Sequence, residues 1–296
     1  MSTNIINPGT LYVVATPIGN LDDMTFRGVE VLSGVHLIAA EDTRTSRVLL
    51  DKYNVKTPLF SCHKFNEGKR GDFFVSKLME GKSIALISDA GTPCISDPGH
   101  LLVSLAHKNG ITVTSVCGAS SVMAALSVSG FDGASFTFIG FLPKGGEGKK
   151  VLADLIKRGG TYVFFESPKR ILKTIANIHE ISDGVNICLC NDLTKKFERI
   201  YHGTAMHVLN QLTENENAEK GEYTCVINSA PQEAVNENSI SIEALLVDIM
   251  AKEGIDLKEA INELKARNKG LQKKQIYNAS LVLKKLLVYN KGILKP

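Results

Sequence analysis

The densest concentration of residues able to contact a ligand is the thirteen-residue stretch SDAGTPCISDPGH, from Ser88 to His100. It holds two Ser-Asp pairs, two prolines and two glycines, and it directly follows the apolar run SIALI. A simple connection between a strand and a helix needs far fewer turn-forming residues than this. Gly91 and Gly99 would let the backbone approach a ligand, and the Asp89 carboxylate could bind an amino group or a hydroxyl. The stretch therefore predicts a loop that wraps a ligand, with a structural Ω-loop as the alternative.

A second candidate ligand loop is ATPIGNLDDMT, from Ala15 to Thr25. Pro17, Gly19 and Asn20 form a turn directly after an apolar run, which would expose backbone groups at the carboxyl edge of a sheet. The same residues also make ordinary connections, so geometry alone favours a ligand loop without requiring one.

A third candidate is AAEDTRTSR, in which Glu41 and Asp42 end a buried run and Thr43 can cap a helix that carries Arg44. Carboxylates at this place could orient a hydroxyl, and arginines could bind phosphates. A helix cap with surface ion pairs explains the same pattern.

The stretch VCGASSV places Ser120 and Ser121 at the start of an Ala-rich helix, just after a strand. Small residues there permit either close helix packing or a cofactor lying against the helix N-terminus. The residues alone do not decide between these two interpretations.

Several common catalytic motifs are absent from the sequence. It has no G-x-x-x-x-G-K-[ST], G-x-G-x-x-G, H-E-x-x-H or G-x-S-x-G pattern, which disfavours the standard nucleotide hydrolases, dinucleotide enzymes, zincins and α/β-hydrolases. The six cysteines form no C-x-x-C pair and mostly sit in apolar runs, so we predict buried thiols and no metal site.

The elements that must position these loops alternate between apolar strands and helical patterns. Four runs near Leu11, Ile38, Leu86 and Val113 each end at turn-forming residues, which predicts a parallel sheet covered on both faces with ligands at the carboxyl ends of its strands. After Gly118 the strands FTFIGF, TYVFFES, NICLCNDL, FERIYHGT and EYTCVIN predict a second α/β domain with more strand-to-strand pairing. We expect an α/β protein with domains at 1–117 and 118–230, a linker at 231–239 and a helical unit at 240–296.

The charge of the chain is unevenly distributed. The whole chain of 296 residues carries a net charge of +3, whereas residues 239–296 alone carry +5. Within this tail a basic cluster near Gly270 suits a phosphate backbone or, alternatively, a solvated helix end. Its members are Arg267, Lys269, Lys273 and Lys274. The sequence has no signal-like N-terminus and no run of eighteen apolar residues, so we expect a cytoplasmic protein with no membrane contact.

Five motifs together resemble the ribosomal RNA small subunit methyltransferase I family, within the tetrapyrrole methylase superfamily. They are LYVVATPIGNLDDMTFRGVEVL, AAEDTRTSRVLL, ISDAGTPCISDPG, FIGFLP and FFESPKRI. The resemblance implies two α/β domains with S-adenosylmethionine in the cleft between them, commonly in a homodimer. It implies 2′-O-methylation of a cytidine ribose in the decoding region of small-subunit rRNA, presented as RNA or as an assembled subunit. It also implies that the basic helical tail helps to hold RNA.

The resemblance further implies a set of cofactor contacts from the loops and from the second domain. The expected contacts are Pro17, Ile18, Gly19, Asp89, Ala90, Gly91, Thr92, Ser120, Ser121, Phe165 and Thr194. The sequence departs from the family pattern in VCGASSV, where Cys117 and Ala119 stand at places usually taken by proline. The helix start at Ser120 is therefore expected to be less rigid.

A sulfonium methyl is already activated, so catalysis mainly requires alignment of sulfur, methyl and ribose oxygen, and a group that accepts or orients the hydroxyl proton. Candidates at or near inferred strand ends are Glu41, Asp42, Asp97 and Glu166. Arg44, Lys169 and Arg170 could hold RNA phosphates. A precorrin C-methyltransferase and an inactive RNA-binding factor with the same fold are the alternative functions.

Overall fold

A computed structural model describes residues 6–231, 241–267 and 273–290 of the chain, without the side chains of 273–274 and 285–290. The chain divides into two compact units, Met1–Gln232 and Glu233–Pro296. Apart from Pro231, the predicted linker 231–239 lies outside the described residues. Among the helices that the structure describes, none combines the length and the apolar character that crossing a lipid bilayer demands.

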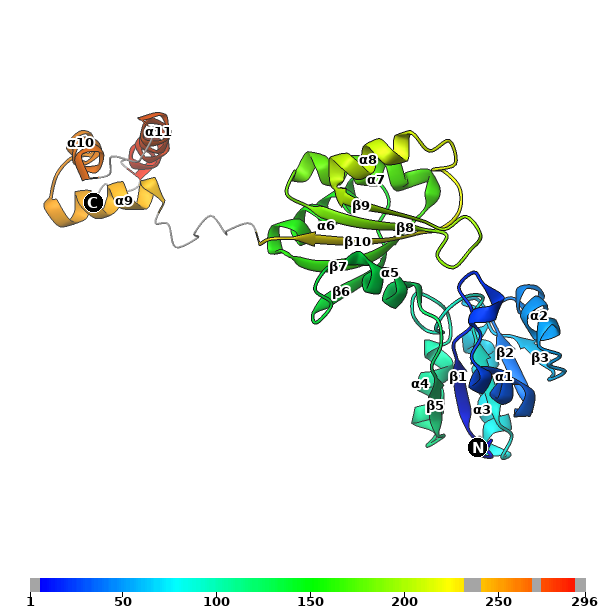
Figure 1. Ribbon diagram of the computed structural model, residues 1–296. Coiled ribbons are helices and arrows are strands. Elements are labelled where there is room, and N and C mark those ends of the chain that lie inside the picture. The colour runs from blue at the N-terminus through cyan, green and yellow to red at the C-terminus, as the bar shows by residue number, and fades with distance from the viewer. Residues whose placement is uncertain (1–5, 232–240, 268–272, 291–296) are drawn as a thin grey trace. The chain divides into compact units, whose positions relative to one another are not determined.

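The first sheet has five parallel strands in the order β3-β2-β4-β1-β5 (Figure 1). The strands are β1 Leu11–Val14, β2 Leu37–Ala40, β3 Leu59–Ser61, β4 Ile84–Ile87 and β5 Val113–Val116. The fold confirms the four strands predicted in this half of the chain and adds β3, which the sequence analysis missed. Because all five strands run parallel, their carboxyl ends lie at one edge of the sheet, where the predicted loops begin.

Helices cover both faces of this sheet, as the near-continuous apolar strands predict. One face packs against the helices α1 Phe26–Gly34 and α2 Thr43–Lys52, and the other against α3 Glu67–Met79 and α4 His100–Lys108. A short 3₁₀ helix, η1 Leu21–Asp23, precedes α1. Neighbouring residues of one strand serve opposite faces, since Leu86 packs with Phe74 of α3 whereas Ile87 packs with Leu50 of α2.

The second sheet is mostly antiparallel, in the order β6-β7-β10-β8-β9, with β6 and β7 parallel. Its strands are β6 Phe136–Phe141, β7 Gly160–Glu166, β8 Asn186–Asn191, β9 Arg199–Thr204 and β10 Tyr223–Ser229. One face packs against α6 Gly146–Arg158, α7 Pro168–Ile181 and α8 Ala205–Thr213, and the other against α5 Ser121–Ser129. The chain therefore passes from the first sheet to the second between β5 and α5, and the predicted boundary at 117–118 stays a prediction.

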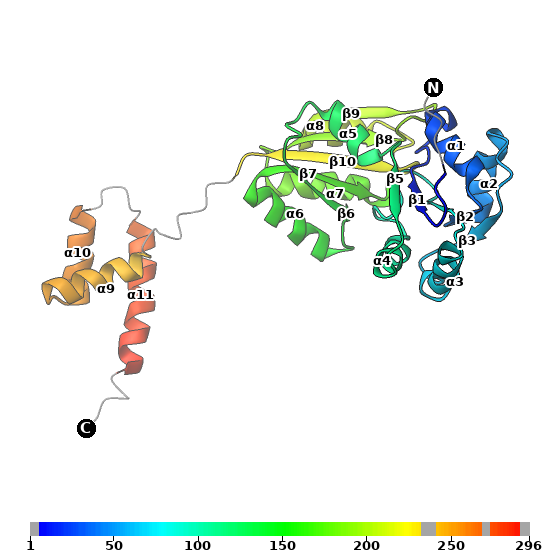
Figure 2. The same ribbon diagram turned by 90° about the horizontal axis from the view of Figure 1, so that it is seen from below.

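The described residues of the second unit form three helices around a small apolar core of their own (Figure 2). They are α9 Ile242–Glu253, α10 Leu257–Arg267 and α11 Lys273–Asn290. Buried residues from all three helices form the core, including Leu246, Leu264 and Ile276. The predicted basic corner near Gly270 falls on residues 268–272, outside the described residues.

Candidate active site

The loops after β1 and β4 are joined by backbone hydrogen bonds. The Thr16 amide donates to the Gly91 carbonyl at 2.9 Å, and the Gly91 amide donates back to the Thr16 carbonyl at 3.0 Å. The Thr16 hydroxyl also donates to the Ser88 carbonyl at 3.2 Å. Since β1 and β4 are adjacent parallel strands, the predicted ligand loops Ala15–Thr25 and Ser88–His100 form one continuous surface at the sheet edge.

The other two predicted loops are tied to the same β4–α4 loop. The Asp42 amide, after β2, donates to Oδ1 of Asp89 at 3.0 Å. The Thr92 hydroxyl donates to the carbonyl of Ala119, after β5, at 3.2 Å. The β4–α4 loop is therefore the centre to which all the predicted loops are bonded.

The β4–α4 loop contains unusual backbone conformations. Gly91 has φ +77°, and a Cβ added there would lie 3.3 Å from Cγ2 of Ile18. Cys94 at φ 72° and Ser96 at φ 64° also adopt the left-handed region, which side chains disfavour. Such strain persists only where the surroundings hold the backbone in place, and it is concentrated at ligand sites.

A buried carboxylate fixes the far end of this loop. Glu67, at the start of α3, is 1% exposed. Its Oε1 accepts hydrogen bonds from the amides of Gly99, Leu101 and Leu102 at 3.1, 2.7 and 3.0 Å. These amides belong to the first turn of α4, where an acceptor and a negative charge are both stabilising.

The loop after β1 also contacts the loop between β8 and β9. The Asn20 amide donates to Oγ1 of Thr194 at 2.9 Å. A Cβ at Gly19 would lie 2.8 Å from the Leu193 carbonyl, so only a bare backbone fits at this contact. Thr194 itself has φ 65°, a strained conformation for a β-branched residue. The turn Pro17 to Asn20 thus docks the loops of the first sheet against the second.

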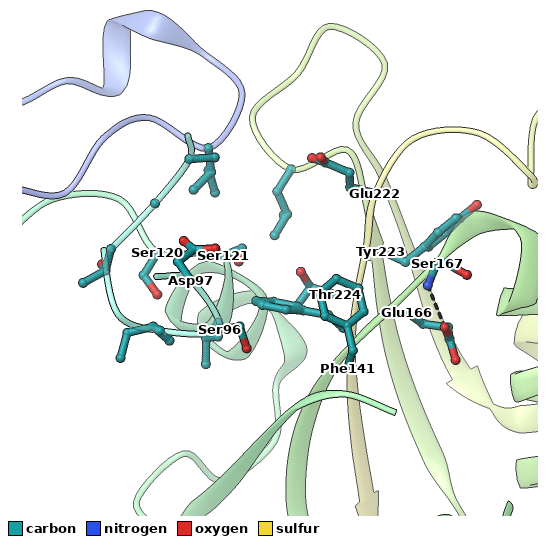
Figure 3. Close-up of a pocket in the computed structure, with 18 of the residues that line it drawn as sticks. Ser96, Asp97, Ser120, Ser121, Phe141, Glu166, Ser167, Glu222, Tyr223 and Thr224 are labelled. Carbon is teal, nitrogen blue, oxygen red and sulfur yellow. Dashed lines mark hydrogen bonds between the residues drawn. The ribbon is translucent and has the colours of Figure 1, made fainter. Parts of the chain in front are cut away.

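These loops and the second sheet enclose a cavity of about 340 Å³ (Figure 3). Ser96, Asp97, Ser120 and Ser121 lie on one side of it, and Phe141 and Thr224 lie across from them. The cavity is lined by hydroxyls, carboxylates, aromatic rings and glycine backbone, a composition typical of small-molecule sites. Its lining residues are Ile18, Ala90, Gly91, Thr92, Ile95, Ser96, Asp97, Ser120, Ser121, Val122, Phe141, Phe165, Glu166, Ser167, Pro168, Leu193, Gly221, Glu222, Tyr223 and Thr224.

Most of the expected cofactor contacts come together in this cavity. The lining includes the expected residues Ile18, Ala90, Gly91, Thr92, Ser120, Ser121 and Phe165. Four others, Pro17, Gly19, Asp89 and Thr194, are not among the lining residues; Gly19 and Thr194 shape the loop contact described above. Direct cofactor contact by any of these residues stays a prediction.

The β4–α4 loop also borders a second hollow of about 430 Å³, here called the carboxylate hollow. Its lining residues are Glu41, Asp42, Thr43, Arg44, Ser61, His63, Lys64, Phe65 and Asp89. Asp89 lines this hollow, whereas the next residue, Ala90, lines the cavity. Two neighbouring sites consequently share one loop.

The carboxylates around this loop differ in their readiness to take a proton. Burial, followed by the negative charges of Asp97 and Asp89, raises the pKa of Glu41. Burial likewise raises the pKa of both Asp89 and Asp97. In contrast, hydrogen bonds from Arg44 lower the pKa of Asp42 to about 2. Glu41 and Asp97 are therefore better proton acceptors than Asp42.

Glu166, the fourth catalytic candidate, is held by three partners. It is 3% exposed, and its carboxylate accepts a hydrogen bond from the Ser167 amide at 2.6 Å (Figure 3). It also accepts one from the Thr174 hydroxyl at 2.8 Å. Arg170 forms a 2.6 Å ion pair with it. These contacts fix the turn between β7 and α7 and engage both oxygens of the carboxylate.

The predicted RNA-binding cations are partly committed to other groups. Arg44 is 90% exposed yet pairs with Asp42 at 2.6 Å, and Arg170 pairs with Glu166. Lys169 is exposed. Arg267 pairs with Glu253 and Glu263 of the second unit. The side chains of Lys269, Lys273 and Lys274 lie outside the described residues, so RNA binding by all of these residues stays a prediction.

Sequence reasoning missed the part of the cavity that the second sheet supplies. Phe141, Glu222 and Thr224 all line it, but none follows a strand of the first sheet. Phe141 was predicted only as part of the strand FTFIGF and of the motif FIGFLP, and neither prediction placed it at a ligand site. Phe65 and His63 were missed because the strand that precedes them, β3, has only three residues.

The model for the family "Tetrapyrrole (Corrin/Porphyrin) Methylases" matches residues 10–208. This match assigns the two sheets, with the cavity at their loops, to that class of protein. Proteins named "Ribosomal RNA small subunit methyltransferase I" are similar over almost the whole chain. That of Pseudomonas aeruginosa is 40% identical over 93% of this chain and 98% of its own length, and that of Halalkalibacterium halodurans is 39% identical over 91% and 94%. The chain belongs to the ribosomal RNA small subunit methyltransferase I family.

A shorter relative with the same name comes from Thermotoga maritima. It is 42% identical over 219 residues, which make up 98% of its own length and 74% of this chain. Some proteins of this name therefore lack residues equivalent to about a quarter of this chain.

Solved structures with low sequence identity share the fold. The cobalt precorrin-4 methyltransferase CbiF has a TM-score of 0.56 at 18% identity, covering 75% of this chain and 95% of that one. Uroporphyrin-III C-methyltransferase from Thermus thermophilus, complexed with S-adenosylhomocysteine, has a TM-score of 0.53 at 14% identity, covering 74% and 97%. These likenesses confirm the predicted fold class.

Proposed function

We propose that this protein transfers a methyl group from S-adenosylmethionine to the ribose 2′-hydroxyl of a cytidine in small-subunit ribosomal RNA. The observation that carries the proposal is the β4–α4 loop, which borders both the cavity and the carboxylate hollow. A methyl donor and an acceptor hydroxyl need adjacent sites, and this loop provides them. Family membership supplies the class of acceptor, since the relatives are named for small-subunit rRNA.

The residues of the cavity fit S-adenosylmethionine. A volume of about 340 Å³ falls within the usual range for ligand sites. The rings of Phe141 and Phe165, with centroids 5.4 Å apart, offer aromatic surface to an adenine. The carboxylates of Asp97 and Glu222 suit an ammonium or sulfonium charge, and the N-terminus of α5 at Ser120 suits a carboxylate. Gly91 has no side chain and therefore leaves space for the ligand at the β4–α4 loop.

When bound, the sulfonium supplies an electrophilic methyl group that needs no covalent help from the protein. The protein itself has to align the methyl donor with the acceptor hydroxyl, and the loops joined by hydrogen bonds supply that alignment. The Thr16 to Gly91 bridge and the Glu67 cap hold both ends of the β4–α4 loop in place. Positioning of this kind can lower a barrier by roughly 7 to 11 kcal/mol.

The 2′-hydroxyl needs a proton acceptor, and the four candidates differ in their availability. Asp42 is occupied by Arg44, and Glu166 is occupied by Arg170, Ser167 and Thr174. Asp97 and Glu41 remain, one in the cavity lining and one in the carboxylate hollow. Because burial raises the pKa of both, each is a stronger base than an ordinary carboxylate. We assign proton acceptance to this pair.

The proposal extends to a homodimer and to a cytoplasmic location, where ribosomal subunits are found. Exposed apolar side chains on α5, with Met123 at 55% and Val128 at 47%, favour burial against another protein surface. Light scattering at micromolar concentration tests this part, and a mass of one chain at all concentrations would contradict it.

The experiment that tests the function is methyl transfer from radiolabelled S-adenosylmethionine to small ribosomal subunits that lack their own methylation. We expect label in the rRNA fraction. Uroporphyrinogen III and precorrins serve as competing acceptors in parallel reactions. Label in a tetrapyrrole and none in rRNA would replace the proposal with a C-methyltransferase activity.

A further inference from the structure

Phe65 has an aromatic ring that the protein leaves exposed beside the proposed reaction site. The residue lies between β3 and α3 and lines the carboxylate hollow, with 90% of its surface exposed. Its neighbour in the hollow is the His63 ring, edge-on at a centroid distance of 6.1 Å. An exposed phenylalanine ring buries little apolar surface and therefore contributes little to the stability of the fold.

The loop that carries Phe65 is nevertheless well ordered by hydrogen bonds. The His63 amide donates to Oδ1 of Asn66 at 2.8 Å, and the His63 carbonyl accepts from the Glu67 amide at 2.9 Å. The Phe65 amide donates to Nδ1 of His63 at 3.2 Å. The ring is therefore presented from a fixed turn anchored to the first residue of α3, which lowers the entropy lost when it contacts a partner.

The charges around the hollow restrict what can bind there. Its interior has the carboxylates of Glu41 and Asp89, which repel an anion but accept hydrogen bonds from hydroxyls. Two exposed cations also border it, Lys64 and the Arg44 side chain that pairs with Asp42. A ligand that suits this pattern has hydroxyls, a flat ring and phosphates that can stay with the cations, which is the chemistry of a ribonucleotide within a strand.

We propose that Phe65 stacks on the base of the target nucleotide, whose ribose enters the carboxylate hollow toward the β4–α4 loop. This inference rests on the proposed function and adds a specific residue for substrate positioning. Sequence-specific recognition of RNA commonly uses unpaired bases that stack on aromatic side chains. The methyl donor would occupy the neighbouring cavity, which Ala90 and Gly91 of the same loop line.

Steady-state methyl transfer to unmethylated small subunits, with the full-length protein, tests the proposal. Loss of one base-to-aromatic stack predicts that Phe65→Ala raises the KM for subunits roughly tenfold to a hundredfold. The dissociation constant for S-adenosylmethionine should be unchanged. Phe65→Tyr and Phe65→Trp keep a stacking ring and should remain within about threefold of the wild-type KM.

Phe26→Ala provides a matched control, because Phe26 lies in the same unit and is 93% exposed but lines neither the cavity nor the carboxylate hollow. It should leave KM unchanged. An unaltered KM in Phe65→Ala, or an equal rise in Phe26→Ala, would overturn the assignment. If the wild-type protein binds S-adenosylmethionine but never labels subunits, the proposed function fails instead, so the two failures are distinguishable.

A spectroscopic test is independent of turnover. The chain has no tryptophan, so F65W with hydroxytryptophan incorporated carries one probe that can be excited apart from the tryptophans of ribosomal proteins. Stacking on a base should quench its emission when subunits are added. F26W, labelled in the same way, should keep its emission. Equal emission changes in both variants, or none in F65W at subunit concentrations that saturate methylation, would contradict the inference.

Discussion

The Glu67 carboxylate accepts a hydrogen bond from the Leu101 amide at 2.7 Å and thereby joins the start of α3 to the start of α4. The same oxygen also accepts hydrogen bonds from Gly99 and Leu102, so one buried side chain replaces the cap that α4 lacks in its own sequence. The α3 helix begins next to the Phe65 turn, and α4 begins where the β4–α4 loop ends. Glu67 thus couples the two proposed ligand-contacting loops.

Removing this cap should destabilise the protein. Glu67→Ala leaves the amides of Gly99, Leu101 and Leu102 without their acceptor, and we expect a loss of about 3 kcal/mol in the free energy of unfolding. Glu67→Gln keeps one acceptor oxygen and should lose less than half as much. Urea denaturation measures both, with Glu80→Gln at the exposed end of α3 as a control that changes little. Equal stability of Glu67→Ala and the wild type would refute the capping role.

We expect Gly91 to be required for the shape of the cavity as well as for the conformation of the β4–α4 backbone. Gly91→Ala and Gly110→Ala both place a side chain at positive φ, +77° and +69°, and each should cost about 1 kcal/mol of stability. Gly91→Ala also pushes against Ile18, whereas Gly110 has no atom within 4 Å of an added Cβ. Calorimetric titration should therefore show weakened S-adenosylmethionine binding, by roughly tenfold, in Gly91→Ala alone. Parallel losses in both variants would contradict this account.

The rate of methyl transfer should depend on the charge of the carboxylates. A carboxylate accepts the proton, so the rate falls as pH drops through its pKa, and the raised pKa of Glu41 places this fall above the ordinary value of 4.5. Asp89→Asn removes a negative charge that raises the Glu41 pKa, and the acid limb of the pH profile should move to lower pH. Saturating S-adenosylmethionine isolates this effect, and Asp72→Asn on the exposed side of α3 should leave the limb in place. A limb that stays fixed in Asp89→Asn would exclude Glu41 as the titrating group.

The C-terminal unit should contribute affinity for the subunit and no part of the chemistry. Every residue that lines the cavity lies between Ile18 and Thr224, and a shorter relative carries the same name. Deleting residues 233–296 should preserve S-adenosylmethionine affinity, weaken subunit binding and flatten its dependence on salt. Replacing Arg267, Lys269, Lys273 and Lys274 by glutamine in the full chain should reproduce part of the flattening. An unchanged salt slope in both proteins would show that the tail does not hold RNA.

The sequence predicted the loops of the first sheet because each follows an apolar run and contains turn-forming residues. Ser88 to His100 was recognised by its density of Gly, Pro and Asp, and it proved to be the loop to which the others are bonded. Strand β3 was missed because three residues give no alternation or long apolar run from which a strand can be recognised.

Other parts of the site depend on contacts between residues far apart in the chain. Glu67 caps a helix more than thirty residues later, and nothing in its local sequence distinguishes it from a surface glutamate on α3. Phe141 and Thr224 reach the cavity only because β6 and β10 belong to a second sheet packed beside the loops. The commitment of Glu166 to Arg170 likewise follows from burial, which sequence spacing alone does not reveal.

The most direct test of the central claim is to identify the methylated atom. Small subunits labelled by the protein can be digested to nucleosides and compared with standards by mass spectrometry, and the modified position can be mapped by the resistance of its 3′ phosphodiester bond to alkali. We predict 2′-O-methylcytidine at a position in the decoding region, with about tenfold less product when Gly91→Ala replaces the wild type at limiting S-adenosylmethionine. A methyl group on a base carbon or nitrogen, with the riboses unmodified, would contradict the account.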